Sequence, residues 1–365
     1  MEITKPKMIY RKLGNSGLDV SILSYGSWLT AHDPESETAI MDCVKKAHEL
    51  GVNFFDTAEV YGAGVAETIF GKALKALDVQ REDLVISTKI MRCGSGPNDS
   101  MLSRKHIIEG LRNSLERLQL EYVDVVFCHR PDTHTNITET CRAMDWVVEE
   151  GLAFYWATSE WTPADIAKAH EICEKEGLNK PIADQCQYSA LWRENFEKNL
   201  RHSFENYKYG TTIWSPLAMG LLSGKYNDGE FPEGSRFKTS DYARDTLLHW
   251  YFGKGDAKKE ETVKILQGIG EIAKDIGCSQ AQLALAWTLV NKDVSTCIFG
   301  ATKVSQVEDN LKSLEVAANW TKELEERFEK VLKNQPEPEM DFNVFAPKTP
   351  RRLVALDLNI PHIEK

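Results

Sequence analysis

The sequence predicts a (β/α)8 TIM barrel with an N-terminal β-hairpin, a long loop after the seventh strand and a C-terminal tail. Eight short apolar runs, rich in β-branched and aromatic residues, recur along the 365 residues. Near-continuous apolarity is typical of strands covered on both faces, as in a parallel sheet. Amphipathic helical segments lie between the runs. Strand followed by helix, repeated eight times, is the pattern of such a barrel.

The elements can be justified in chain order. Residues 8–20 carry Gly14-Asn15-Ser16-Gly17 between apolar flanks, which predicts the hairpin. Ser103, Thr162, Ser279 and Ser305 each precede a helical pattern and are expected to be N-caps. The loop is expected from residue 221 to about residue 261. The predicted strands are 20–28, 52–58, 84–89, 123–129, 153–159, 182–188, 211–216 and 295–301.

Composition narrows the class of protein. The chain has 44 basic and 55 acidic residues, a net charge of −11 and no block of like charge, which disfavours a nucleic-acid or anionic-membrane role. Its eight cysteines are scattered without a CxxC pair, which argues against a disulfide framework or a zinc site. No apolar stretch has the length of a signal peptide or of a membrane span. We therefore expect a reduced, cytoplasmic protein with one barrel domain over 1–365, its core at 8–335 and its tail at 336–365.

Polar residues end three consecutive runs, where the active site of a barrel lies. Asp56 ends the second run and is followed by Tyr61, Lys89 ends the third and His129 ends the fourth. Taken singly, each has an ordinary structural explanation, such as a turn, a solvated charge or core packing. An ammonium group near a tyrosine favours the phenolate, and a histidine can orient a carbonyl. Together the four residues predict a general acid for carbonyl chemistry.

At these residues the chain resembles the aldo-keto reductase superfamily over residues 8–335. Residues 56–62 (DTAEVYG) and 118–132 (LQLEYVDVVFCHRPD) resemble two family signatures. The second, with residues 214–218 and 300–302, is most similar to the branch of the voltage-gated potassium channel β subunits and their plant and fungal relatives. The resemblance implies metal-free, NADPH-dependent carbonyl reduction, with Tyr61 as proton donor, Lys89 and Asp56 tuning it and His129 orienting the carbonyl.

The resemblance also implies the cofactor site. Lys225 and Arg236 lie in the long loop, where cations can clamp phosphates, and Thr302 and Lys303 are expected at a 2′-phosphate, which favours NADPH over NADH. The full set of implied cofactor residues is Ser27, Trp28, Asp56, Ser159, Gln185, Trp214, Ser215, Pro216, Leu217, Ala218, Met219, Lys225, Arg236, Gly300, Thr302, Lys303, Gln306, Asp309 and Asn310. An aromatic substrate pocket is expected from Trp28, Tyr61, His129, Trp161, Tyr188 and Trp192.

Two positions depart from the animal channel subunits. His129 stands where those subunits carry Asn, which favours an enzyme, and Glu160 stands where they carry Arg. The alternative is a cofactor-binding, redox-sensing β subunit of a membrane channel. Several relatives in this branch are tetramers, so a homotetramer is also expected. A hydrolase using Asp56 and Glu59 is a weaker alternative, because the two residues lie three apart on a turn rather than across a cleft.

Overall fold

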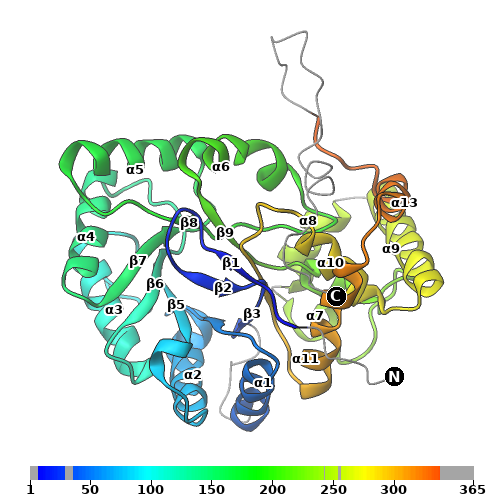
Figure 1. Cartoon of the computed structure of the whole chain (residues 1–365), viewed down its shortest axis with the longest axis horizontal. Coiled ribbons are helices and arrows are strands. Elements are labelled where there is room, and N and C mark those ends of the chain that lie inside the picture. The colour runs from blue at the N-terminus through cyan, green and yellow to red at the C-terminus, as the bar shows by residue number, and fades with distance from the viewer. Residues whose placement is uncertain (1–6, 29–35, 242, 254–255, 338–365) are drawn as a thin grey trace.

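Eight parallel strands close into a barrel in the order β10-β3-β4-β5-β6-β7-β8-β9, as the sequence predicts. The computed structural model describes residues 7–28, 36–241, 243–253 and 256–337. Figure 1 shows the strands at the centre with α1 to α6 around them. The barrel strands are β3 Leu23–Gly26, β4 Phe54–Asp56, β5 Val85–Ile90, β6 Val123–Cys128, β7 Ala153–Thr158, β8 Ala183–Asp184, β9 Gly210–Ile213 and β10 Thr296–Phe299.

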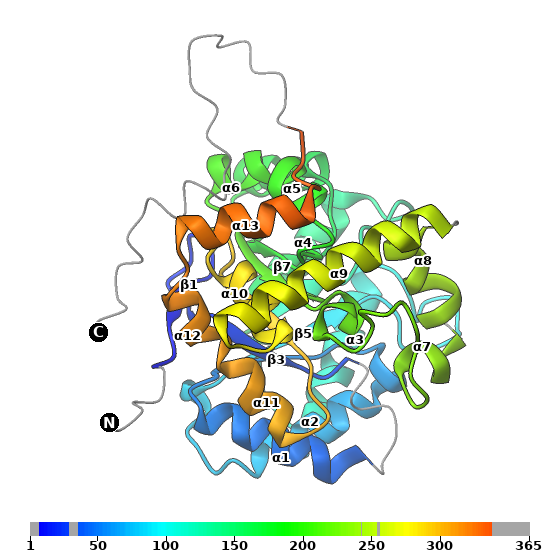
Figure 2. The same ribbon diagram turned by 90° about the vertical axis from the view of Figure 1, so that its right-hand side faces the viewer.

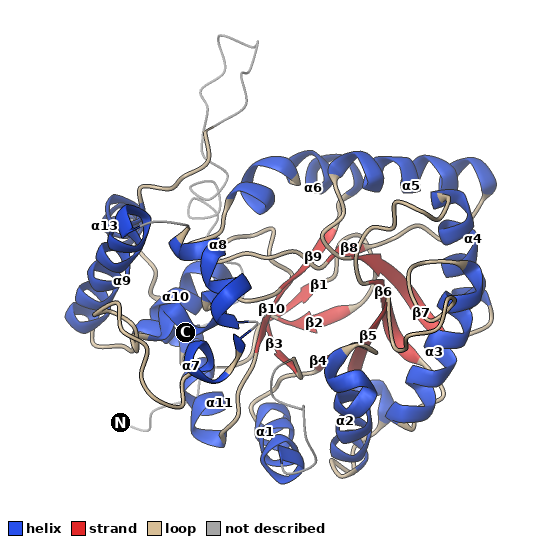
Figure 3. Cartoon of the chain, turned by 180° about the vertical axis from the view of Figure 1, so that it is seen from behind, coloured by secondary structure: helices blue, strands red, loops and turns tan. Residues whose placement is uncertain are grey.

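The helices connect successive strands and pack their apolar faces against the outside of the barrel. Figure 2 shows that α9 and α13 lie side by side, and Figure 3 shows the barrel from behind. The α-helices are α1 Glu37–Glu49, α2 Val65–Lys75, α3 Arg104–Leu118, α4 Ile137–Glu149, α5 Pro163–Glu176, α6 Arg201–Tyr207, α7 Arg236–Thr239, α8 Leu248–Phe252, α9 Asp256–Ile276, α10 Gln280–Leu289, α11 Val304–Leu311, α12 Ser313–Ala318 and α13 Lys322–Leu332.

The predicted hairpin is formed by β1 (Tyr10–Lys12) and β2 (Asp19–Ser21), which pair antiparallel. Leu13 and Val20 pack among the residues that begin the barrel strands and close that end of the barrel. The Arg11 guanidinium donates to the carbonyl oxygens of Leu289, Asn291 and Val294, the last at 2.5 Å. One predicted boundary was wrong. Residues 19–21 belong to the hairpin, and the first barrel strand begins only at Leu23, because the chain passes from one sheet to the other at Ile22.

The segment after β9 is less loop-like than predicted. Besides η5 (Ala218–Ser223), it contains α7, η6 (Ala243–Leu247), α8 and the start of α9. Tyr226, Phe231, Phe237 and Phe252 contact one another at ring-centroid distances of 5.3–6.0 Å, and this small apolar cluster explains the local order. Of the predicted tail, residues 338–365 lie outside the described residues.

Three of the four predicted caps are confirmed. The side chains of Ser103, Thr162 and Ser279 each accept a hydrogen bond from a backbone N–H in the first turn of their helices. The fourth was wrong: α11 already begins at Val304, so Ser305 lies inside its first turn.

Candidate active site

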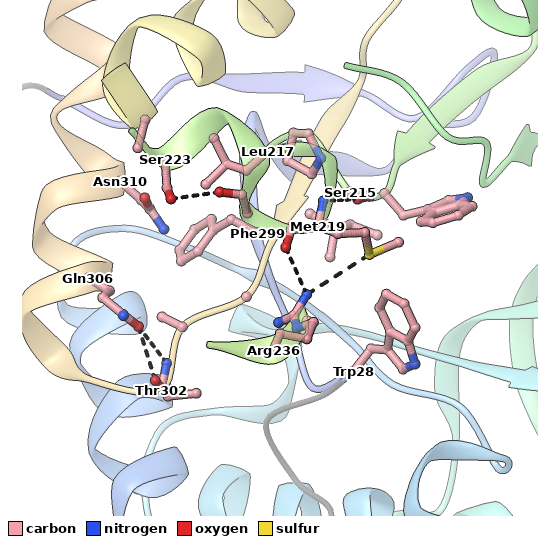
Figure 4. A pocket seen from close by; sticks show the side chains of 18 of the residues that line it. Trp28, Ser215, Leu217, Met219, Ser223, Arg236, Phe299, Thr302, Gln306 and Asn310 are labelled. Carbon is pink, nitrogen blue, oxygen red and sulfur yellow. Dashed lines mark hydrogen bonds between the residues drawn. The ribbon is translucent and has the colours of Figure 1, made fainter. Parts of the chain in front are cut away.

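A cavity of about 1060 Å³ opens at the carboxyl ends of the strands, opposite the hairpin. Figure 4 shows part of its lining, with Arg236 between Met219 and Trp28, and with Thr302 and Gln306 at one end. Most of the predicted site residues line this one cavity, namely Trp28, Asp56, Tyr61, His129, Gln185, Trp214, Ser215, Pro216, Leu217, Met219, Lys225, Arg236, Gly300, Thr302, Gln306, Asp309 and Asn310.

The buried ion pair of Asp56 and Lys89 lies at one end of the cavity. Asp56 pairs with Ser87 across β4 and β5, and strand periodicity places Lys89 on the same inward face as Ser87. The Lys89 ammonium donates to Asp56 Oδ2 at 2.5 Å and to the Thr57 carbonyl oxygen at 2.7 Å. Ser87 donates to Asp56 Oδ1 at 2.7 Å. Hydrogen bonds therefore satisfy the charges of this fully buried pair, as buried ion pairs require.

Tyr61 completes this group from the turn after β4. Lys89 Nζ lies 3.2 Å from the Tyr61 hydroxyl and 4.8 Å from its ring centre. From the sequence, the Lys89 ammonium is expected to lower the pKa of Tyr61. Lys89 does act in that direction, but burial acts more strongly and raises the pKa of Tyr61 above 10.0. The hydroxyl is therefore protonated at neutral pH.

His129 faces Tyr61 across the cavity, with ring centres 5.7 Å apart and the rings nearly perpendicular. Burial, assisted by Lys89 and Arg130, holds the pKa of His129 well below 6.5, so its ring is neutral at pH 7. Its Nδ1 is buried and has no hydrogen-bond partner among the described residues. The nitrogen accessible from the cavity is therefore Nε2.

Gln185 and Trp214 continue the wall beside this group. Gln185 Nε2 donates to Asp56 Oδ1 at 3.1 Å and to Thr212 Oγ1 at 3.2 Å. The Trp214 ring meets Trp28 edge-on at 6.3 Å and Trp250 at 6.4 Å. The wall of the cavity next to Tyr61 is thus largely aromatic.

The loop after β9 forms the middle of the lining in a strained conformation. Ser215, Ala218 and Met219 have φ values of 54°, 49° and 60°, in the left-handed region that favours glycine. Such strain gathers at functional sites. The Ser215 hydroxyl accepts a hydrogen bond from the Met219 backbone N–H at 2.9 Å, which stabilises the turn.

Two cations from the inserted segment reach the cavity. Arg236 is half-buried, and its hydrogen bonds within the described residues are weak, to the carbonyl oxygen of Met219 at 3.4 Å and to the Met219 sulfur at 4.0 Å. Burial lowers the pKa of Arg236 below its usual range. Within the described residues, no carboxylate pairs with Arg236 or with the exposed Lys225. This part of the cavity therefore has positive charge to offer an anion.

The far end of the cavity is formed around the start of α11. Gln306 Oε1 accepts from both the backbone N–H and the hydroxyl of Thr302, at 2.8 and 3.2 Å. Both Asp309 oxygens are already engaged, by Gln282 at 2.6 Å and Ser279 at 3.0 Å. Asp309 is therefore fixed in place by α10 and its cap.

Four predicted cofactor residues do not line the cavity. Ser27, Ser159 and Ala218 are buried behind its wall. Ser27 donates to the Thr57 hydroxyl, and Ser159 donates to the Gln185 carbonyl oxygen. Lys303, the N-cap residue of α11, is exposed and outside the lining.

Three predicted substrate-pocket residues also lie elsewhere. Trp161 is buried in the outer core. Tyr188 is fully buried, stacks on Phe196 at 4.1 Å and donates its hydroxyl to Glu197 at 2.6 Å. Trp192 lies behind Trp250, at a ring distance of 6.2 Å. Proximity to strand ends in the sequence does not fix the direction of a side chain, and these three point away from the cavity lining.

Sequence reasoning missed several lining residues. Arg130 directly follows His129 at the end of β6, so its position at a strand end was a usable signal. Trp250, Tyr226 and Ser223 come from the inserted segment, whose folding the periodicity did not reveal. Ser305 lines the cavity as a residue of the first turn of α11 rather than as its cap.

Among the described residues, no three or more His, Cys, Asp or Glu side chains cluster with the geometry for a metal ion. In the same part of the chain, no helix has both the length and the apolar character needed to cross a membrane.

The chain is thus a closed parallel barrel with a buried Asp–Lys pair against a tyrosine at its strand ends. Residues 22–332 match the aldo/keto reductase family, and the chain belongs to that family. Its members are oxidoreductases that act on small molecules and generally use NAD(P)H.

Named relatives cover nearly the whole chain. A rice protein named "Probable voltage-gated potassium channel subunit beta" is 43% identical over 90% of this chain and 98% of its own length. An Arabidopsis thaliana protein of the same name is 42% identical over 90% of this chain and 98% of its own. A Schizosaccharomyces pombe protein named "Putative voltage-gated potassium channel subunit beta" is 45% identical over 91% of this chain and 96% of its own.

Proposed function

We propose that this chain reduces aldehydes and ketones to alcohols with NADPH, using Tyr61 as the proton donor. The observation that carries the proposal is the position of the Lys89 ammonium, which bridges Asp56 at 2.5 Å and the Tyr61 hydroxyl at 3.2 Å on the cavity wall. The neutral His129 ring lies opposite. This set matches the need of carbonyl reduction, in which an oxygen gains negative charge and accepts a proton.

The residues of the cavity fit a phosphorylated dinucleotide. Its volume of about 1060 Å³ is at the upper end of the usual range for ligand pockets. The half-buried Arg236 has no described carboxylate partner, which suits a phosphate ligand. Trp214 and Gln185 would hold the nicotinamide end, Arg236 and Lys225 the phosphates, and Thr302, Gln306 and Asn310 the adenosine end. When bound, the reduced nicotinamide supplies the hydride.

The chain's own groups manage the proton and the charge. Tyr61 holds its proton at neutral pH and donates it from the hydroxyl to the carbonyl oxygen of the substrate. The Lys89 ammonium stabilises the phenolate left behind, and its hydrogen bond to Asp56 fixes it in place. The neutral His129 orients the carbonyl through Nε2. The aromatic wall excludes water, so these charges act at a low local dielectric.

The direct test is NADPH oxidation by the purified protein with 4-nitrobenzaldehyde, beside Tyr61→Phe and with NADH in parallel. We expect turnover of about one per second or more that is weak with NADH and lost in the variant. Tight NADPH binding with negligible turnover would overturn the reductase proposal.

That outcome would favour a second candidate, a cofactor-binding β subunit of a potassium channel in a homotetramer. The names of the relatives at 42–45% identity support it. It predicts that the protein sediments as a tetramer and is retained by detergent-solubilised channel complexes, with or without substrate turnover.

A further inference from the structure

Glu160 occupies a strained turn beyond the end of β7. Its φ of 56° is unusual for a residue other than glycine. The buried Asp184 holds the turn: its carboxylate accepts from the backbone N–H of Glu160 at 3.1 Å and of Trp161 at 3.3 Å. The Thr158 hydroxyl donates to the same carboxylate at 2.7 Å. The positive φ of Glu160 is energetically unfavourable, yet it is maintained at the edge of the cavity. This suggests a role for the Glu160 side chain.

The Glu160 side chain bridges two neighbouring strands without lining the cavity. Its Oε1 accepts from the backbone N–H of Gln187 at 2.6 Å and from the indole Nε1–H of Trp214 at 2.8 Å. An indole has one donor and no acceptor, so this is the single hydrogen bond that the Trp214 ring can donate. Hydrogen bonds to a charged acceptor are roughly twice as strong as neutral ones.

The other contacts of the Trp214 ring restrain it less. Trp28 and Trp250 meet it at steep angles of 85° and 68°, with centre distances of 6.3 and 6.4 Å. The Arg130 guanidinium lies 5.8 Å from the ring centre, and Arg130 is itself held by the Ser159 hydroxyl at 2.8 Å. None of these contacts involves the indole N–H, whereas the bond to Glu160 fixes its direction.

We propose that Glu160 is a positioning residue that sets the plane of the Trp214 indole and so the surface offered to the nicotinamide ring. The cofactor part of this inference rests on the proposed function; the indole contact does not. Asp184 supports the arrangement, since burial and the nearby Glu160 raise the pKa of Asp184 to about 7, which reduces repulsion between the two carboxyl groups at neutral pH.

The first test uses the protein without cofactor. Of the nine tryptophan indole N–H resonances in a ¹⁵N spectrum, the one lost in Trp214→Phe identifies Trp214. We expect Glu160→Ala to move that resonance upfield and to speed its hydrogen exchange at least tenfold. Glu160→Gln, which keeps a carbonyl acceptor, should change both less. An unchanged resonance and exchange rate in a folded Glu160→Ala protein would overturn the proposal.

The second test measures NADPH binding by fluorescence titration in a double-mutant cycle. Glu160→Ala should raise the Kd about tenfold, but less than twofold when Trp214 is already Phe, because Glu160 acts through the indole. Glu171→Ala, on the exposed face of α5, is the matched control and should leave the Kd unchanged. Equal effects in both backgrounds would overturn the proposal. Failure of the wild type to bind NADPH would overturn the proposed function, and the indole resonance would still decide whether Glu160 fixes Trp214.

Discussion

The two ends of the cavity are stabilised in opposite ways. At the Tyr61 end, Asp56 and Lys89 project from adjacent strands and are saturated with hydrogen bonds from their neighbours. At the other end, Arg236 and Lys225 come from the inserted segment, and no described carboxylate neutralises them.

The difference separates two tasks. Proton transfer needs groups held in place before substrate arrives, which strands and a buried ion pair provide. Anion binding needs charge that is not already paired within the protein. The inserted segment supplies that charge. Because Arg236 and Lys225 form no ion pair within the described residues, they can pair with an anionic ligand. Substitutions at the Tyr61 end should therefore change catalysis or stability, whereas substitutions at the Arg236 end should change the affinity for the cofactor.

Tyr61→Phe should have the largest effect. We expect kcat to fall by about 10³-fold or more, because general acid catalysis contributes up to about 10⁴-fold. The Kd for NADPH should stay within twofold, since the ring and its packing remain. Steady-state kinetics and fluorescence titration measure the two quantities. Activity within tenfold of the wild type would remove Tyr61 from the proton-donor role.

Lys89→Met tests how much the buried Asp56–Lys89 ion pair at the Tyr61 end contributes to stability. It leaves the Asp56 charge buried without its partner, and we expect a loss of about 3–5 kcal/mol in the free energy of unfolding. Urea denaturation at pH 7 measures this loss. The double variant Lys89→Met with Asp56→Asn should recover most of the stability while remaining inactive. Equal stability of the single and double variants would show that the pair is not what orders this end.

Arg236→Ala should weaken anion binding at the opposite end of the cavity. We expect the Kd for NADPH to rise about 10–100-fold, as for a lost charge-assisted contact to phosphate, with stability nearly unchanged. The matched control is Lys238→Ala, an exposed residue of the same short helix. Loss of stability without a change in Kd would mean that Arg236 holds the inserted segment rather than an anion.

Thr302→Ala and Lys303→Ala sharpen the comparison within the anion end. Only Thr302 lines the cavity, so we expect its loss to raise the KM for NADPH a fewfold more than that for NADH. Lys303→Ala should change either KM by less than about twofold. A larger effect from Lys303 would return it to the 2′-phosphate role that the resemblance implies.

The smallest expected change is with pH. The pKa of His129 is depressed well below 6.5 and that of Tyr61 is raised above 10.0. A required acid is active below its pKa and lost above it, so the acid form of Tyr61 persists through neutrality. The kcat for carbonyl reduction should therefore be flat from pH 6 to 8. A change in kcat with a midpoint near pH 6.5 would show that His129 titrates there.

The barrel and the polar residues at the Tyr61 end of the cavity could be predicted because both depend on strand ends, whereas the residues at the anion end came from the family resemblance. Asp56, Lys89 and His129 end successive apolar runs, and parallel strands bring their carboxyl ends to one rim. Side-chain direction was not predictable from position alone. Tyr188 lies close to a strand end, yet its ring belongs to the core.

The direction of the pKa shift of Tyr61 could not be predicted from the sequence either. The sequence shows Lys89 near Tyr61 but not how deeply the hydroxyl is buried, and burial decides the direction of the pKa. The sequence predicts a loop for the inserted segment because it is rich in Gly, Lys, Asp and aromatic residues. Its aromatic residues meet only after the chain has folded back on itself. The role of Glu160 depends on one bond to Trp214, 54 residues further on.

The hairpin that closes the barrel has a consequence for synthesis of the chain on the ribosome. Arg11 is bonded to the carbonyl oxygen of Val294, 283 positions later in the chain. At about 5–20 residues per second, the partner is made roughly a quarter of a minute to a minute after Arg11. Arg11 therefore leaves the ribosome well before the carbonyl oxygens that it binds in the folded chain have been synthesised.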